Sequence, residues 1–263
     1  MSIADSGIRK LWTSEQLKLA FHLYCQLPFG RLHSRTPEVV ALANLIGRTP
    51  SAVAMKLVNF ASLDPDITGS GRRGLSNASV ADRAVWDEFH MDWEGLDSQC
   101  LDMLARLNAT RSFAPEINSF AEPQVEYVGE VRTASVDVRL KQDFFRRSVL
   151  ASYESRCCMS GLSADELIVA SHIVPWAEDV KNRLNPHNGL CLSSIHDRAF
   201  DRGLITVTPN MVVRVSRKVA KLATGSKLGA LLAALEGHKI TMPRKFWPAP
   251  EFLRWHNENL FKE

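Results

Sequence analysis

One stretch, residues 156–204, constrains the fold more than any other part of the chain. Within it, residues 166–170 are mostly apolar and partly β-branched, a composition typical of a short buried strand. Ser171 and His172 follow directly, so the strand would deliver both side chains to its end. Pro175 then closes the strand and starts a polar, turn-rich loop.

The loop is predicted to end at Asn188 and Gly189, a pair that favours a turn because Gly allows a positive φ and Asn can hydrogen-bond across it. Leu190 and Leu192 then indicate a second strand, and the residues from His196 onward a helix ending near Gly203. The expected order is strand, loop, strand, helix, with a histidine on each side of a cleft.

Two histidines in such a unit suit hydrolysis of a phosphodiester. A base must take a proton from water while a cation holds the phosphate and the departing oxygen. Histidine suits the base because its ordinary pKa lies near neutrality, and its neutral nitrogen also binds transition metals. His172, Asn188 and His196 are therefore the candidate catalytic residues.

The motifs S-H-I-x-P-W, N-G-L-x-L and H-D-R-A-F-D-x-G-L together resemble the HNH (ββα-metal) endonucleases, and more closely their restriction and phage-defence branch. The resemblance implies that His172 is the general base, that Asn188 braces the loop to orient that base, and that His196 binds a metal. It also implies one divalent ion, with Mg²⁺, Mn²⁺, Co²⁺, Ni²⁺ and Zn²⁺ all open.

The chain departs from the wider family at two places. Many HNH nucleases carry Asp or His immediately before the base as a second metal ligand, whereas this chain has Ser171, a poor ligand. The second protein ligand is therefore open between Ser171, Asp197 and Asp201. Other relatives hold the motif with a four-cysteine zinc site, but here Cys157 and Cys158 are adjacent, and we infer no structural zinc.

The first part of the chain is predicted to be all-helical. One helix lies within residues 9–28, a second starts at Pro37, Gly47 ends it, and Thr49 caps a third. This arrangement is typical of a helix-turn-helix, whose second helix can lie in a groove of DNA. The segment also resembles the N-terminal region of HNH restriction-type proteins, some of which cut only DNA with modified cytosine.

Basic residues flank the candidate site and the predicted helix-turn-helix. Net charge is only +3, so attraction to phosphate would depend on local clusters rather than on the total. The candidate DNA contacts are Arg48, Ser51 and Lys56 on the third helix, Arg72 and Arg73 in a following loop, and Arg217 and Lys218 after the nuclease motif.

The whole chain is thus expected to be an α+β protein with three segments. Residues 1–110 would form a helical DNA-recognition domain, residues 111–135 a linker, and residues 136–263 a ββα-metal nuclease domain. Composition excludes a disordered or membrane chain, since 45% of the residues are hydrophobic and 23% charged. Five cysteines, an odd number, argue against a disulfide framework, and a cytoplasmic location is the simplest expectation.

The function predicted from these features is metal-dependent cleavage of double-stranded DNA, in restriction or defence. Cutting both strands would need a homodimer or two sequential nicks. The main alternative is a DNA-binding regulatory protein with a degenerate, inactive HNH core, which Ser171 favours. An RNase or toxin, and two histidines with purely structural roles, are the remaining alternatives.

Overall fold

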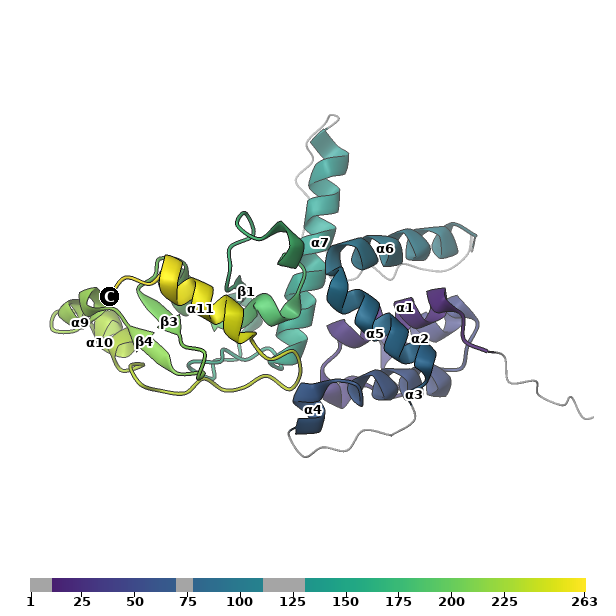
Figure 1. The fold of residues 1–263 in the computed structure, drawn as a ribbon, viewed down its shortest axis with the longest axis horizontal. Helices are drawn as coiled ribbons and strands as arrows, with labels where there is room; N and C mark the ends of the chain where they lie inside the picture. Colours follow the sequence, from purple (N-terminus) through teal and green to yellow (C-terminus); the bar gives the residue numbers. More distant parts are fainter. Residues whose placement is uncertain (1–10, 70–77, 111–130) are drawn as a thin grey trace, which may run out of the picture.

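The computed structural model describes residues 11–69, 78–110 and 131–263 (Figure 1). Arg72, Arg73 and residues 111–130 of the predicted linker lie outside these ranges. The described chain is rich in helix and carries two small two-stranded sheets, which confirms the α+β class. None of the helices in the described ranges has the length and hydropathy that crossing a membrane requires.

The first part of the chain is helical, as predicted. The side chain of Thr13 accepts a hydrogen bond from the backbone N–H of Gln16 and starts the first helix, and Thr49 starts the third in the same way. Gly47 ends the second helix with φ of 66°, a left-handed conformation that glycine adopts readily. The helices are α1 (Ser14–Gln26), α2 (Pro37–Ile46), α3 (Pro50–Ala61), α4 (Pro65–Gly69), α5 (Val80–Met91) and α6 (Trp93–Thr110).

A long helix, α7 (Val131–Ser152), packs against both parts of the chain, with α1 and α6 on one side and the first sheet on the other (Figure 1). It begins inside the predicted linker. Two adjacent residues show its double role: the Phe144 ring stacks on His22 of α1 with centroids 4.9 Å apart, and the Phe145 ring stacks on His172 at 3.7 Å.

The part of the chain after α7, residues 153–263, has the predicted order of strand, loop, strand and helix. Strands β1 (Ile168–His172) and β2 (Gly189–Ser193) pair antiparallel, and α8 (Ser194–Asp201) follows directly. A second hairpin follows, formed by β3 (Ile205–Val207) and β4 (Val213–Val215). The remaining helices are α9 (Arg217–Leu222), α10 (Lys227–Ala233) and α11 (Pro250–Asn259).

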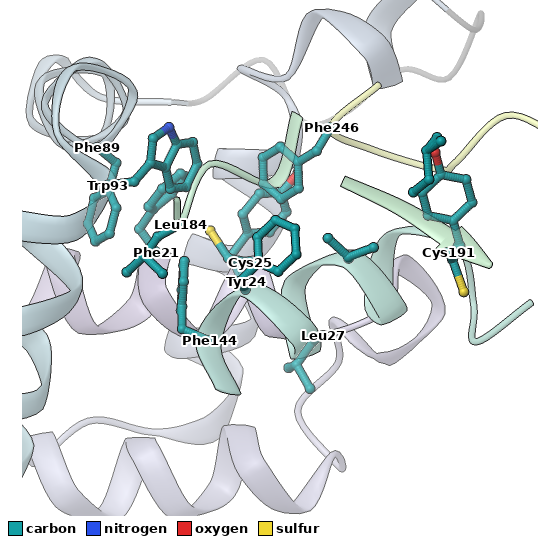
Figure 2. Close-up of a cluster of buried hydrophobic side chains, with 14 of the residues drawn as sticks. Phe21, Tyr24, Cys25, Leu27, Phe89, Trp93, Phe144, Leu184, Cys191 and Phe246 are labelled. Atoms are coloured by element: carbon teal, nitrogen blue, oxygen red, sulfur yellow. The ribbon is translucent and has the colours of Figure 1, made fainter. Parts of the chain in front are cut away.

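Buried side chains of the first six helices and of the residues after α7 join in one hydrophobic cluster. Figure 2 shows this continuity, with Phe21 of α1 and Trp93 of α6 near Phe144 of α7 and Phe246 of the C-terminal segment. The Trp93 ring lies 5.9 Å from Phe246 and 6.4 Å from Phe144. The two predicted domains are therefore separate in sequence but share a core.

A buried lysine fastens the C-terminal segment to α1. The Nζ atom of Lys245 donates hydrogen bonds to the carbonyl oxygens of Tyr24, Cys25 and Leu27 at the end of that helix, the last two at 2.9 Å. Its side chain is 1% exposed, and burial lowers its pKa to about 8. Because the last carbonyls of a helix lack the usual partners within it, Lys245 satisfies those of Cys25 and Leu27. It is a second donor to the Tyr24 carbonyl, which also accepts from the Leu27 N–H.

Replacing Lys245 should therefore destabilise the fold. In Lys245→Met the buried carbonyls lose their donor, and we expect the free energy of unfolding to fall by about 3 kcal/mol. The exposed Lys221 offers a control: Lys221→Met should change it by less than about 0.5 kcal/mol. Urea unfolding followed by circular dichroism measures both, and equal effects would contradict the role given to Lys245.

Candidate active site

His172 is the last residue of β1, directly opposite Gly189 of β2. Its ring lies almost parallel to that of Phe145, with centroids 3.7 Å apart and an interplanar angle of 10°. Trp176 approaches the same imidazole edge-on, at 5.6 Å. These aromatic contacts fix the orientation of the imidazole and remove most of it from water.

The hydrogen bond of His172 determines which ring nitrogen carries the proton. Nε2 lies 2.9 Å from the carbonyl oxygen of Arg183, and a carbonyl only accepts, so the Nε2–H donates. Burial lowers the pKa of His172, and the Arg183 carbonyl offsets this only in part. His172 is therefore neutral at neutral pH, with an unprotonated Nδ1 available as a base.

Asn188 holds the loop between β1 and β2. Its side chain is buried, its Oδ1 accepts from the backbone N–H of Val174 at 2.8 Å, and its Nδ2 donates to the Val174 carbonyl at 3.1 Å. A longer contact of 3.4 Å joins Nδ2 to the Asn182 carbonyl. These bonds tie the residues just after His172 to the start of β2, the geometry that a brace for the base requires.

Gly189 is needed for space rather than for an unusual backbone conformation. The sequence predicts a positive φ here, and this was wrong, since φ is −130°. A Cβ atom at this position would lie 2.4 Å from Cγ2 of Val149 and 3.1 Å from Cζ of Phe145. The close approach of α7 to β2, and with it the stacking of Phe145 on His172, depends on this glycine.

His196 lies on α8 and is oriented by a cysteine. Its Nδ1 is 3.2 Å from Sγ of Cys157. Burial raises the pKa of this thiol, but hydrogen bonds from His196, from Ser160 and from backbone amides outweigh burial and lower the pKa to about 6. In the tautomer whose Nδ1–H donates to this sulfur, Nε2 is the nitrogen able to bind a metal.

The other candidate metal ligands lie in different surroundings. Ser171 precedes His172 on β1, so its side chain points to the opposite face of the sheet; it is 3% exposed, and its Oγ has no hydrogen-bond partner in the described residues. Asp201 is exposed, yet partial burial and the nearby Asp197 carboxylate raise its pKa. Across the described ranges, no three His, Cys, Asp or Glu side chains gather closely enough to hold an ion.

His196 nevertheless fits a metal. An imidazole that binds a metal through one nitrogen is commonly fixed by a hydrogen bond at the other, which Cys157 supplies. Catalytic sites also leave coordination positions open to water and substrate. His196 is therefore the protein ligand that the structure supports best.

The predicted DNA contacts differ in their surroundings. Lys56 binds the buried carboxylate of Asp82 at 2.7 Å, which holds α3 to α5. Arg48 lies in the turn before α3 and donates to Oε1 of Gln16 at 2.8 Å, which holds that turn to α1. Ser51 is exposed on α3. On α9, Arg217 and Lys218 are exposed and form no ion pair with any described residue.

Sequence reasoning missed one wall of the site. A cavity of about 260 Å³ lies beside His172, and three of its lining residues belong to α7: Gln142, Phe145 and Arg146. Trp176 also lines it, and Arg183 lies over the Trp176 ring at 5.2 Å. The signals in the sequence were the amphipathic pattern of α7 and the basic residues before the motif, Arg146 among them, and neither shows which strand that helix would cover.

Strand, loop, strand and helix, with one histidine at the end of β1 and a second on α8, form the ββα arrangement that the sequence predicts. Residues 157–208 match the family model of HNH endonucleases, and this segment contains β1, β2, α8 and β3. The match supports a nuclease and covers less than half of the chain. A search of curated proteins gave no match.

Removing the side chain of Asn188 should loosen the loop that follows His172. In Asn188→Ala the buried N–H of Val174 loses its acceptor, and we expect a loss of about 2 kcal/mol in the free energy of unfolding. Hydrogen exchange of the Val174 amide should become faster. Asn259→Ala removes an exposed asparagine as a control, and a Val174 amide equally protected in both variants would contradict the brace.

Proposed function

We propose that this protein is a metal-dependent endonuclease that hydrolyses double-stranded DNA. The observation that carries the proposal is the neutral imidazole of His172, held by the Arg183 carbonyl and Phe145 beside a cavity, within a segment that matches the HNH endonucleases. A base of this kind takes a proton from water when its pKa lies near or below the working pH.

In the proposed reaction, Nδ1 of His172 accepts a proton from the water that attacks the phosphorus. The Nε2–H bond to Arg183 keeps the imidazole in the required tautomer and stabilises the imidazolium that forms. Asn188 keeps the loop behind His172 in place. A divalent ion at His196 would stabilise charge on the phosphate and on the leaving 3′ oxygen.

The finer parts of the proposal rest on the sequence resemblance and on α2 and α3. These helices, joined at Gly47, form a helix-turn-helix arrangement, and Ser51 and Met55 are exposed on α3. We propose that this part positions duplex DNA and that the protein acts in restriction or defence in the cytoplasm, with selectivity for modified cytosine as one form of that role.

A DNA-binding protein with an inactive core is the second candidate. Two observations favour it: the described residues contain no group of three metal-binding side chains, and Ser171 points to the face of β1 opposite His172. Such a protein would bind DNA but would not cut it, whichever divalent ion is supplied. Cleavage by the wild-type protein therefore decides between the two candidates.

The test is cleavage of two plasmids, one unmodified and one with methylated or hydroxymethylated cytosine, in Mg²⁺, Mn²⁺, Co²⁺ and Ni²⁺. We expect nicking or cutting, and His172→Ala should slow it by about 10²–10⁴-fold because the general base is lost. His238 is exposed, and His238→Ala serves as the control histidine. Equal rates for wild type and His172→Ala would overturn the assignment of the base.

The pH dependence gives a separate prediction. The active form of His172 is neutral, so kcat/KM should fall as the pH drops through its pKa, which burial lowers below the ordinary 6.5. The acid limb should therefore have its midpoint below pH 6.5. Phe145→Ala exposes the imidazole and should move that midpoint upward. A wild-type midpoint at or above 6.5 would contradict a buried, neutral His172 as the base.

A further inference from the structure

The cavity beside His172 has a wall that lies outside the HNH segment. Gln142, Phe145 and Arg146 come from α7, whereas the family match begins only at Cys157. Gln142 and Arg146 are four residues apart on the helix and therefore share one face. Both side chains are exposed. The cavity thus combines the proposed base with a polar amide and a cation from a different element.

Arg146 differs from the other basic residues of α7 whose side chains are described. Lys141 pairs with Glu94 at 2.8 Å, and Arg147 pairs with Asp143 at 2.8 Å. Arg146 forms no ion pair with any carboxylate of the described residues. Its positive charge is therefore uncompensated at the cavity, while the charges of its neighbours are balanced within the protein.

The guanidinium of Arg146 is anchored next to the strand that carries His172. Its Nη1 donates to the carbonyl oxygen of Ile168, the first residue of β1, at 3.2 Å. A guanidinium has five N–H donors, so this bond leaves others to bind an anion. Arg146 also follows Phe145, whose ring stacks on His172. The backbone of α7 thus fixes the cation and the base relative to each other.

We propose that Arg146 is a phosphate-positioning residue that binds a phosphodiester of DNA in this cavity and holds it beside Nδ1 of His172. The proposal rests on the proposed function, since it assigns that site a substrate contact. The planar fork of arginine can bind two phosphate oxygens at once, which fixes orientation as well as distance. Trp176 supplies an apolar wall for the adjoining sugar or base.

The first test measures binding without catalysis. Binding of a short fluorescent DNA duplex is followed by anisotropy in EDTA across a series of KCl concentrations. The binding constant K falls as salt rises, and each phosphate contact contributes roughly 0.9 to the magnitude of the slope of log K against log salt. Arg146→Gln should therefore weaken binding and make this slope shallower by about one. Arg146→Lys retains the charge and should retain the slope.

Arg147→Gln is the matched control, because Arg147 is the next residue and already pairs with Asp143. It should leave the slope unchanged. The inference is overturned if Arg146→Gln keeps the wild-type slope, if Arg147→Gln lowers it equally, or if the wild-type protein does not bind the duplex. Circular dichroism and urea midpoints close to wild type establish that each variant is folded.

The second test separates this inference from the proposed function. With a metal that supports cleavage, Arg146→Gln should lower kcat/KM by about 10²-fold, and Arg146→Lys should lower kcat more than it raises KM, because charge without the fork misplaces the phosphate. Wild-type cleavage with unchanged kinetics in Arg146→Gln overturns the inference alone. A lowered binding slope without cleavage by wild type in any metal supports the phosphate site and overturns the nuclease proposal.

Discussion

The stacking of Phe145 on His172 is the contact on which the rest of the site depends. It requires α7 to approach β2 closely, and Gly189 permits this because a Cβ atom there would collide with Val149. On the other side of α7, Phe144 stacks on His22 of α1. One helix therefore joins the helical part of the chain to the hairpin, and a change in its position would affect both.

This arrangement also explains the chemistry of His172. An imidazole in water is partly protonated near neutrality, and a protonated imidazole cannot act as a base. Phe145 and Trp176 cover much of the ring, and the Arg183 carbonyl accepts the single proton that remains. His196 is fixed by different means, through Cys157, so the two proposed roles of base and metal ligand have separate supports.

Local patterns in the sequence predicted the parts of the fold that local interactions determine. Thr49 starts a helix as expected because a cap needs only the next three residues, and the order of strand, loop, strand and helix follows from short apolar runs. The three residues His172, Asn188 and His196 were placed on the expected elements, although their catalytic roles stay predictions.

Contacts between distant segments were beyond the reach of such patterns. The basic residue Lys56, predicted to face DNA, pairs with Asp82 from another helix, and Lys245 enters the core to reach α1 from the far end of the chain. The wall that Arg146 forms depends on which side of α7 covers β1. Periodicity shows that a helix has an apolar face but does not identify its partner.

The proposed reaction requires the fold to present His172 as a neutral imidazole with an unprotonated Nδ1. A ¹⁵N NMR titration of the histidine side chains, with His172→Gln to assign the resonance, tests it directly. We expect a proton on Nε2 at pH 7 and a pKa below 6.5 for His172. A proton on Nδ1 at pH 7, or a pKa above 6.5, would contradict it.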